Sequence, residues 1–294
     1  MAMVAVGPVP GTNPAGSQET QQVTKSQASD PDPSADQTIV VTATRSAQPV
    51  DRIGQSVTIV DSAEIARLQA VVVSDLLRRT PGVTVARNGG TGTNASVNIR
   101  GAEGDQTVAL IDGIKLNDPS TPGGGFNFGN LLVGNIARIE VVRGAQSVLW
   151  GSQAIGGVIN LITAQPTNVF RTNARAETGS FGSAQAVANL SGGTGAVTGS
   201  LGAGYFRTHG ISAFDGGREK DGFHQFGANA NVKLSLSPAA SVELRGFYTR
   251  GKVEIDGSPA PTFRFQDTQE YSRTRQALAY AGLSAELFNG RFHN

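Results

Sequence analysis

The second half of the chain alternates apolar and polar residues with a period of two, the pattern of β-strands with one apolar face. HQFGANANVKLSL, for example, places Phe226 and Val232 on one face and Gln225 and Lys233 on the other. Alternation over about ten residues exceeds the usual globular strand of about 5–6 residues and matches a tilted membrane strand of about 9–11. We expect about six such strands between 168 and 287, in a transmembrane β-barrel. A water-soluble sheet with one wet face is the alternative.

Residues 36–165 show a mixed pattern of short helices and short strands. Asp61 precedes Glu64 by three residues, which is the spacing of a capping box at a helix start. Ser74 is expected to cap a second helix, which buries two leucines and stops at Pro81. This pattern predicts a compact α+β domain. The predicted strands are VNIRG, TVALIDGIKL, IARIEVVRG and GGVINLIT, and two glycine-rich loops cover 87–96 and 117–130.

The segment before this domain has almost nothing to bury. Residues 1–35 are rich in Pro, Gly, Ser, Gln and Asp, so we expect a disordered tail. The stretch DQTIVVTATR (36–45) that follows is rich in Thr, Val and Ile, which favours a strand. No tight hairpin turn joins it to a partner, so the sequence predicts an unpaired strand.

Composition excludes several classes of function. The net charge of +1 gives no electrostatic reason to expect a nucleic-acid partner. The chain has no cysteine for a disulfide or thiolate metal site, and only 3 histidines. No run approaches the roughly 20 apolar residues of a membrane helix, and the start lacks the basic region of a signal peptide.

Catalytic constellations are also missing from the sequence. The three histidines have no serine or cysteine nucleophile in a recognisable context. The glycine-rich loop RNGGTGTNAS matches neither phosphate-binding motif, GxxxxGK[ST] or GxGxxG between a strand and a helix. We therefore expect a protein that is not an enzyme.

The mixed segment resembles the plug domain of TonB-dependent outer-membrane transporters. Five motifs in order carry the resemblance: QTIVVTATR, VSDLLRRTPGV, NIRG, ALIDGIKLND and IARIEVVRGAQSVLWGSQAIGGVINLIT. In that family the plug fills a 22-stranded barrel in the bacterial outer membrane and faces the periplasm. The resemblance implies a tail at 1–35, a TonB box at 36–45, an α+β plug domain at 46–165 and the first strands of an incomplete barrel at 166–294.

The resemblance gives the strand 36–45 a partner. In the family, the box pairs with the periplasmic domain of TonB, which ExbB–ExbD energise. An extended segment with unpaired backbone groups is a template for such strand addition. The alternative is that 38–44 is an ordinary edge strand of the plug. The residues implied in TonB binding are Gln37, Thr38, Ile39, Val40, Val41, Thr42 and Ala43.

Within the family the likeness to cobalamin transporters is greatest, in NGGTG, THG (208–210) and DGF (221–223). It implies a small-molecule substrate bound at the plug apex, either cobalamin or a ferric siderophore. An anionic siderophore would favour several cations there, and the loops offer only Arg87 and Lys115. The residues implied in substrate binding are Asn88, Gly89, Gly90, Asp118, Pro119, Ser120, Thr121 and Pro122.

Two further sets of polar residues carry predictions. Arg100 and Arg143 stand in predicted strands among apolar neighbours, and a buried guanidinium needs a carboxylate such as Asp112 or Glu140. We interpret these four residues as anchors between plug and barrel. The resemblance also implies a possible calcium site in the stretch after THG. Its expected ligands are Asp215 and Asp221, with Glu219, Glu254 and Asp256 able to add oxygens towards the 6–8 that calcium takes.

The residues after Asn168 supply about a quarter of what a 22-stranded barrel needs. We therefore expect a partial sequence of a transporter. The alternatives are a plug-type binding module and one part of a split transporter.

Overall fold

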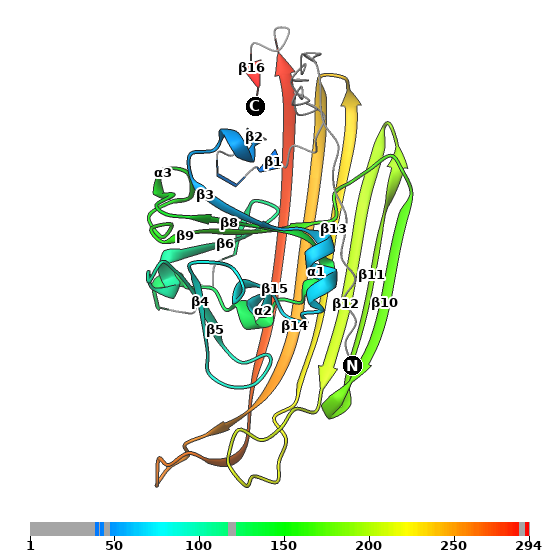
Figure 1. Cartoon of the computed structure of the whole chain (residues 1–294). Helices are drawn as coiled ribbons and strands as arrows, with labels where there is room; N and C mark the ends of the chain where they lie inside the picture. The colour runs from blue at the N-terminus through cyan, green and yellow to red at the C-terminus, as the bar shows by residue number, and fades with distance from the viewer. Residues whose placement is uncertain (1–38, 41, 44–47, 117–121, 288–291, 294) are drawn as a thin grey trace, which may run out of the picture. The chain divides into compact units, whose positions relative to one another are not determined.

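The computed structural model describes residues 39–40, 42–43, 48–116, 122–287 and 292–293 (Figure 1). A sheet of five strands and a sheet of seven strands dominate these ranges, and two pairs of short strands accompany them. No helix in the described ranges is long and apolar enough to cross a membrane. The five-stranded sheet precedes the seven-stranded sheet along the chain.

The five-stranded sheet is mixed, and its order β3-β8-β9-β6-β7 brings distant segments together. Only β6 and β9 run parallel. The apolar runs that predict strands here all form them, but TVALIDGIKL forms a hairpin because Asp112 and Gly113 adopt positive φ. The strands of this sheet are β3 (Ser56–Val60), β6 (Thr107–Ile111), β7 (Ile114–Leu116), β8 (Ile136–Arg143) and β9 (Gly157–Thr163). A separate antiparallel pair consists of β4 (Val83–Arg87) and β5 (Ala95–Ile99).

One predicted helix cap is confirmed and the other is wrong. The side chain of Asp61 accepts a hydrogen bond from the backbone nitrogen of Glu64 at 2.8 Å, which starts the first helix. Ser74 lies inside the second helix, and its buried hydroxyl accepts from Arg87 Nη2 at 2.8 Å. That bond explains the polar residue at a buried position. The helices are α1 (Ser62–Leu68), α2 (Val73–Leu77) and α3 (Ser147–Trp150), and the 3-10 turns are η1 (Val50–Arg52), η2 (Gly104–Gln106), η3 (Pro122–Gly124), η4 (Phe128–Asn130), η5 (Val133–Asn135) and η6 (Ser180–Gly182).

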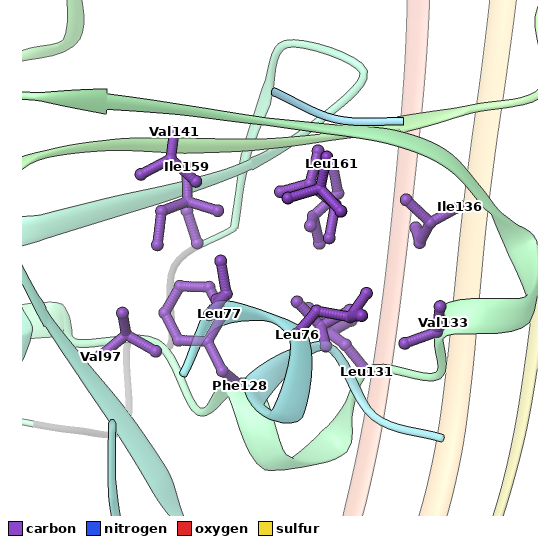
Figure 2. Packing of buried hydrophobic residues seen from close by; sticks show 14 of the residues in the cluster. Leu76, Leu77, Val97, Phe128, Leu131, Val133, Ile136, Val141, Ile159 and Leu161 are labelled. Carbon is purple, nitrogen blue, oxygen red and sulfur yellow. The ribbon is translucent and has the colours of Figure 1, made fainter. Parts of the chain in front are cut away.

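The core of this domain lies between α2 and the five-stranded sheet (Figure 2). Leu76 and Leu77 are at most 1% exposed, which confirms their predicted burial. Phe128, Ile159 and Leu161 surround them and are fully buried. Burial of a side chain of this size stabilises the fold by about 1.5–3 kcal/mol relative to exposure to water.

The seven-stranded sheet is antiparallel, and each strand pairs with the next along the chain (Figure 1). Among the described residues, the first and last strands have one neighbour each, so this sheet is open. The poorly alternating TRQALAYAGLSAEL lies in its longest strand. The strands are β10 (Arg171–Gly179), β11 (Ser183–Thr194), β12 (Val197–Thr208), β13 (Phe223–Ser237), β14 (Ala240–Gly257), β15 (Gln266–Leu287) and the two-residue β16 (Phe292–His293).

The two faces of this sheet differ in burial. On β13, Phe223 and Gln225 are buried, whereas His224 and Phe226 are exposed. Gln225 donates from Nε2 to the backbone oxygen of Asn130, which lies in the first domain. The buried face of the sheet therefore covers the α+β domain, and we call the opposite side the outer face.

Candidate functional site

The segment predicted as an unpaired strand has a partner in the structure. β1 (Ile39–Val40) pairs antiparallel with β2 (Gln48–Pro49), so that part of the prediction is wrong. A pair of two-residue strands makes few backbone hydrogen bonds, and an isolated hairpin is at best marginally stable in water. Side chains of the α+β domain therefore contribute much of what holds this segment. Gln37, Thr38 and Val41 of the predicted TonB box lie outside the described residues.

Thr42 is docked in the α+β domain by four hydrogen bonds and is 1% exposed. Its backbone nitrogen and its hydroxyl both donate to Glu140 Oε2, at 3.1 and 2.5 Å. Asn160 Nδ2 donates to the Thr42 hydroxyl at 3.0 Å, and Trp150 Nε1 donates to the Thr42 carbonyl at 2.9 Å. Ala43 beside it is equally buried. The sequence contains no local signal for this dock, because its parts come from distant segments.

Glu140 binds residues of the α+β domain and of the docked segment. Its carboxylate is fully buried, pairs with Arg138 at 2.7 Å, and accepts from Thr42. Arg143 donates to the Pro81 carbonyl of the same domain at 2.5 Å. Arg100 is exposed and stands after β5 at φ 53°, so the prediction that it is buried in a strand is wrong.

Asp112 is the predicted anchor that contacts the seven-stranded sheet. Arg245 of β14 donates from Nη1 to the backbone oxygen of Asp112. The Asp112 carboxylate accepts from the backbone nitrogen and hydroxyl of Thr163, at 2.9 and 2.7 Å. Burial raises the pKa of Asp112, and the bonds from Thr163 and the charge of Arg245 oppose that rise. The sequence reasoning missed Arg245, although VELR places it on the polar face beside Glu243, with which it pairs at 2.6 Å.

A continuous path of hydrogen bonds joins β14 to the docked threonine. Arg245 holds the carbonyl of Asp112, and the next residue, Gly113, donates its N–H to Asn160 Oδ1 at 3.2 Å. Asn160 in turn donates to Thr42. A hollow of ≈440 Å³ lies against this path and is lined by all five of these residues. The docked segment and a strand of the second sheet are thereby joined through residues of the α+β domain.

Three of the predicted substrate residues lie on the β4–β5 connection. Asn88, Gly89 and Gly90 are exposed there. Gly92 adopts φ 92°, and a Cβ at this position would lie 2.1 Å from the ring of Phe223. The loop therefore touches the start of β13. Asp118, Pro119, Ser120 and Thr121 lie outside the described residues, and of Pro122 only its place at the start of η3 is described.

Carboxylates gather on the connections next to this loop. Oxygens of Glu219, Asp256 and Asp267 lie within 4.8 Å of one another. Asp221 interacts with the same group. Burial and the charges of Asp256 and Asp267 raise the pKa of Asp221, whereas a hydrogen bond from the Ala213 N–H lowers it. Burial, followed by the charge of Asp267 and then Asp221, also raises the pKa of Glu219. Asp215 is exposed and outside the group of three. The sequence reasoning missed Asp267, which stands at the start of β15, one connection beyond the predicted stretch.

The comparison with protein families decides the nature of the first domain. Residues 49–158 match the model of the TonB-dependent receptor plug domain. The chain carries a TonB-dependent receptor plug domain. This agrees with the five motifs of the sequence, and it makes the docked Thr42 part of the segment that precedes the plug. The relatives of the chain are transporters and receptors and not enzymes, as the sequence predicts.

Two vitamin B12 transporters named BtuB are similar to this chain. That of Vibrio vulnificus is 44% identical over 126 residues, which are 43% of this chain and 20% of the relative. That of Photobacterium profundum is 30% identical over 266 residues, which are 89% of this chain and 42% of the relative. The chain therefore spans less than half the length of these two relatives.

Solved receptors share the fold. Pseudomonas aeruginosa FpvA bound to heterologous pyoverdines matches with a TM-score of 0.72 and 21% identity, over 86% of this chain and 34% of that one. The alcaligin outer-membrane receptor FauA of Bordetella pertussis matches with a TM-score of 0.66 and 18% identity, over 85% and 40%. At these identities the likeness shows the fold alone, a plug followed by antiparallel strands.

Proposed function

We propose that this chain supplies the plug and the first barrel strands of a TonB-dependent outer-membrane transporter whose cargo is cobalamin. The observation that carries the proposal is the docking of Thr42, because a segment held by a few side-chain bonds can be released and pulled. In this proposal the chain consists of the tail 1–35, the box 36–45, the plug 46–165 and the barrel strands 166–294. The plug faces the periplasm in this arrangement.

The box is the handle in the proposed mechanism. While docked, residue 42 satisfies its backbone groups with Glu140 and Trp150. After release these groups need new partners, and a strand of TonB added along residues 37–43 supplies them. Backbone pairing resists a pull along the strand, so TonB, energised by ExbB–ExbD, can draw on the plug and open a passage.

The proposed substrate site lies at the other end of the same strands. The loop with Asn88, Gly89 and Gly90 touches Phe223, which pairs with Val253 of β14. Arg245, next to the box, lies eight residues before Val253, roughly 26 Å along an extended strand. Substrate at residues 88–90 and 118–122 would therefore act on the box through the plug and this strand.

Calcium is a proposed structural ion of the loops beside this site. Carboxylate oxygens are the donors that calcium prefers, and Glu219, Asp256 and Asp267 offer three within reach of one ion. Burial raises the pKa values of Glu219 and Asp221, and the negative charges of neighbouring carboxylates raise them further. Calcium would supply a positive charge and hold the β12–β13 and β14–β15 connections together.

A ferric siderophore is the second candidate cargo, because the solved receptors that share the fold include those for pyoverdine and alcaligin. The sequence relatives favour cobalamin, since the vitamin B12 transporter of Photobacterium profundum aligns over 89% of the chain. A plug-type binding module without transport is the remaining alternative.

The test is a receptor in which this chain is continued by the remaining strands of a vitamin B12 transporter. We expect it to bind cyanocobalamin more tightly than ferric pyoverdine or ferric alcaligin, and to take it up only in cells that contain TonB. Val41→Pro removes a backbone donor from the box, so it is expected to abolish uptake and leave binding intact. Tighter binding of a ferric siderophore would mean that the cargo is a siderophore and not cobalamin. Uptake by the proline variant would refute the proposed role of the box.

A further inference from the structure

One side chain joins the two glycine-rich loops of the α+β domain. Asn127 lies directly before η4, and its Oδ1 accepts a hydrogen bond from the N–H of Gly129 at 2.9 Å. The same oxygen accepts from the N–H of Ala95, the first residue of β5, at 3.0 Å across 32 positions of the chain. Ala95 is fully buried, so no water can replace this partner of its N–H. A single acceptor therefore caps η4 and holds the end of the β4–β5 connection.

The backbone of the β4–β5 connection lies against the same turn. A Cβ at Gly129 would lie 2.1 Å from the carbonyl oxygen of Thr93, so the two backbones approach closely here. The hydroxyl of Thr93 donates to the carbonyl of Gly90 at 2.8 Å, and the N–H of Asn88 donates to the carbonyl of Asn94 at 3.1 Å. These bonds join the exposed end of the loop to the part that lies on η4.

The other end of η4 is bound to the seven-stranded sheet. Asn130 Nδ2 donates to Thr274 Oγ1 of β15 at 3.0 Å. The carbonyl of Asn130 accepts from Gln225 Nε2 of β13, and this nitrogen also donates to Thr249 Oγ1 of β14 at 2.7 Å. Asn130 is 6% exposed and Gln225 is 1% exposed, so these bonds lie in a region of low dielectric constant, where they are stronger than in water. The turn is thereby connected to three neighbouring strands.

The turn itself is held firmly in the core. Phe128 is fully buried and packs edge to face against Phe126, with 5.1 Å between the ring centroids. Leu131, directly after the turn, accepts at its carbonyl from the N–H of Val73 of α2 at 2.9 Å. Because a close-packed core resists displacement, η4 is a fixed support for the loop that lies on it.

We propose that Asn127 is a positioning residue that sets the place of the substrate loop 88–94 on η4, and that Asn130 sets the place of η4 relative to β13–β15. Asn127 acts on the cargo through the loop. A loop that must be ordered during binding lowers the affinity by the cost of that ordering, so a loop held in place beforehand binds more tightly. The inference rests on the proposed function, because it takes residues 88–90 as part of the cargo site, and it names the residues on which the geometry of that site depends.

The test uses three substitutions that separate the two bonds of Asn127. Asn127→Asp keeps both acceptor bonds. Asn127→Ser keeps an acceptor that caps η4, but its hydroxyl ends one bond earlier and does not reach Ala95. Asn127→Ala loses both bonds. Spin labels on Gly90→Cys and Gly246→Cys, where nothing lies within 4 Å of either Cβ position, report the place of the loop relative to β14 by pulsed electron paramagnetic resonance on the full chain in detergent micelles.

We expect a broader distance distribution in the serine and alanine variants of Asn127 and a native distribution in the aspartate variant. A native distribution in Asn127→Ser, or a broadened one in Asn127→Asp, would overturn the proposal. Should Asn127→Ala fail to fold, Asn127→Ser decides the outcome, because it retains the cap of η4.

The affinity of the completed receptor for cyanocobalamin gives the second measurement. Asn127→Ser should weaken binding at least about fivefold, since one buried N–H loses its partner, and Asn127→Asp should bind within about twofold of the native receptor. Unchanged affinity in Asn127→Ser would overturn the inference and leave cobalamin as the cargo. A native receptor that does not bind cobalamin would refute the proposed cargo, whereas the distance measurement needs no cargo and would still test the position of the loop.

Two further variants test whether the effect belongs to these bonds. Asn94→Ala makes the same change at an exposed asparagine of the same loop, and we expect a native distance distribution. Broadening equal to that of Asn127→Ser would overturn the proposal, because any substitution in the loop would then loosen it. Thr274→Val removes the acceptor of Asn130 Nδ2 and should also broaden the distribution. An unchanged distribution would overturn the role of Asn130.

Discussion

The backbone nitrogen of Thr42 donates to the carboxylate of Glu140 over 3.1 Å, although 98 positions separate the two residues in the chain. The hydroxyl of Thr42 donates to the same oxygen. A buried carboxylate that loses a donor has no water to replace it, so its desolvation remains uncompensated. Release of the segment that contains Thr42 would therefore leave this carboxylate without two of its donors.

The first prediction follows from that contact. Thr42→Val keeps the shape of the side chain but removes the donor to Glu140 and the acceptor for Asn160. We expect a loss of about 1–3 kcal/mol from the docked state. The chain has no cysteine, so a single cysteine at Ile39 can carry a spin label. Its electron paramagnetic resonance spectrum should show a larger mobile fraction in the variant.

Thr84→Val is the control for this experiment. Thr84 is exposed, and its hydroxyl makes one hydrogen bond, to the Asn98 carbonyl at 3.3 Å. The same substitution there should leave the spectrum of the label at Ile39 unchanged. If the label were equally mobile in Thr42→Val and in the native chain, the hydrogen bonds of the Thr42 hydroxyl would not hold this segment.

The second prediction concerns the contact between the β4–β5 connection and β13. Gly92→Ala places a methyl group 2.1 Å from the Phe223 ring at a residue with φ 92°. Backbone strain costs about 1–2 kcal/mol, and overpacking adds about 1–3 kcal/mol. Urea unfolding monitored by circular dichroism measures the sum. We also expect altered substrate affinity in a completed receptor, because the neighbouring residues 88–90 must shift.

Gly101→Ala isolates the backbone part of this effect. Gly101 has φ 80°, and nothing lies within 4 Å of the position that a Cβ would take. The variant should lose only the strain, and the difference between the two alanine variants should equal the clash with Phe223. Equal losses in both variants would show that the loop moves away from the ring without cost.

The parts of the fold that the sequence predicts are those with a local cause. The period of two along HQFGANANVKLSL follows from the geometry of a single strand, and the cap of Asp61 acts over three residues. The hairpin at Asp112-Gly113 also has a local signal, the Asp-Gly turn between apolar runs, which we interpreted as one strand. Gly92 and Phe223, by contrast, meet only because the sheet covers the plug, and no local pattern encodes that contact.

The candidate site divides in the same way. Motifs that resemble the family predict a box and an apex loop, but they do not predict which residues hold these segments. The contacts of Arg245 and Asp267 could not be predicted from the sequence, because they depend on how β14 and β15 pair with each other and pack on the plug. Arg100, assigned as a buried anchor from its apolar neighbours, is exposed because it stands at the turn after β5.

The third prediction concerns the carboxylates beside the apex. The pKa values of Glu219 and Asp221 are raised, by burial first and then by neighbouring carboxylates. Protonation therefore stabilises the folded loops. That stabilisation is complete below the unfolded pKa values near 4 and is lost as the pH rises through the raised folded values. Without calcium, the melting temperature of the native chain should therefore fall more between pH 4 and pH 7 than that of Asp221→Asn. Glu254, whose pKa is lowered, contributes in the opposite sense in both chains.

Calcium should reverse this loss at pH 7. At a free concentration 100 times Kd the expected stabilisation is about 2.7 kcal/mol, and it should shrink as the pH falls and protons compete. Asp267→Asn should remove the effect, and Asp215→Asn, the same change outside the group of three, should retain it. If Asp215→Asn alone abolished the response, the ion would bind at a different place from the one proposed.

The last prediction concerns the link between β14 and the plug. Arg245→Gln removes the donor to the Asp112 carbonyl and leaves half-buried Glu243 without its cation. We expect a loss of about 1–3 kcal/mol in the free energy of unfolding. Arg250→Gln is the matched control, because it lies on the same strand but on the outer face, and exposed substitutions usually change stability by at most about 0.5 kcal/mol. In the spin-label experiment Arg245→Gln should also increase the mobility of a label at Ile39. Arg245 holds Asp112, and the next residue, Gly113, donates to Asn160, which binds Thr42. A destabilised plug with an unchanged label would mean that the barrel strand supports the plug without communicating with the box.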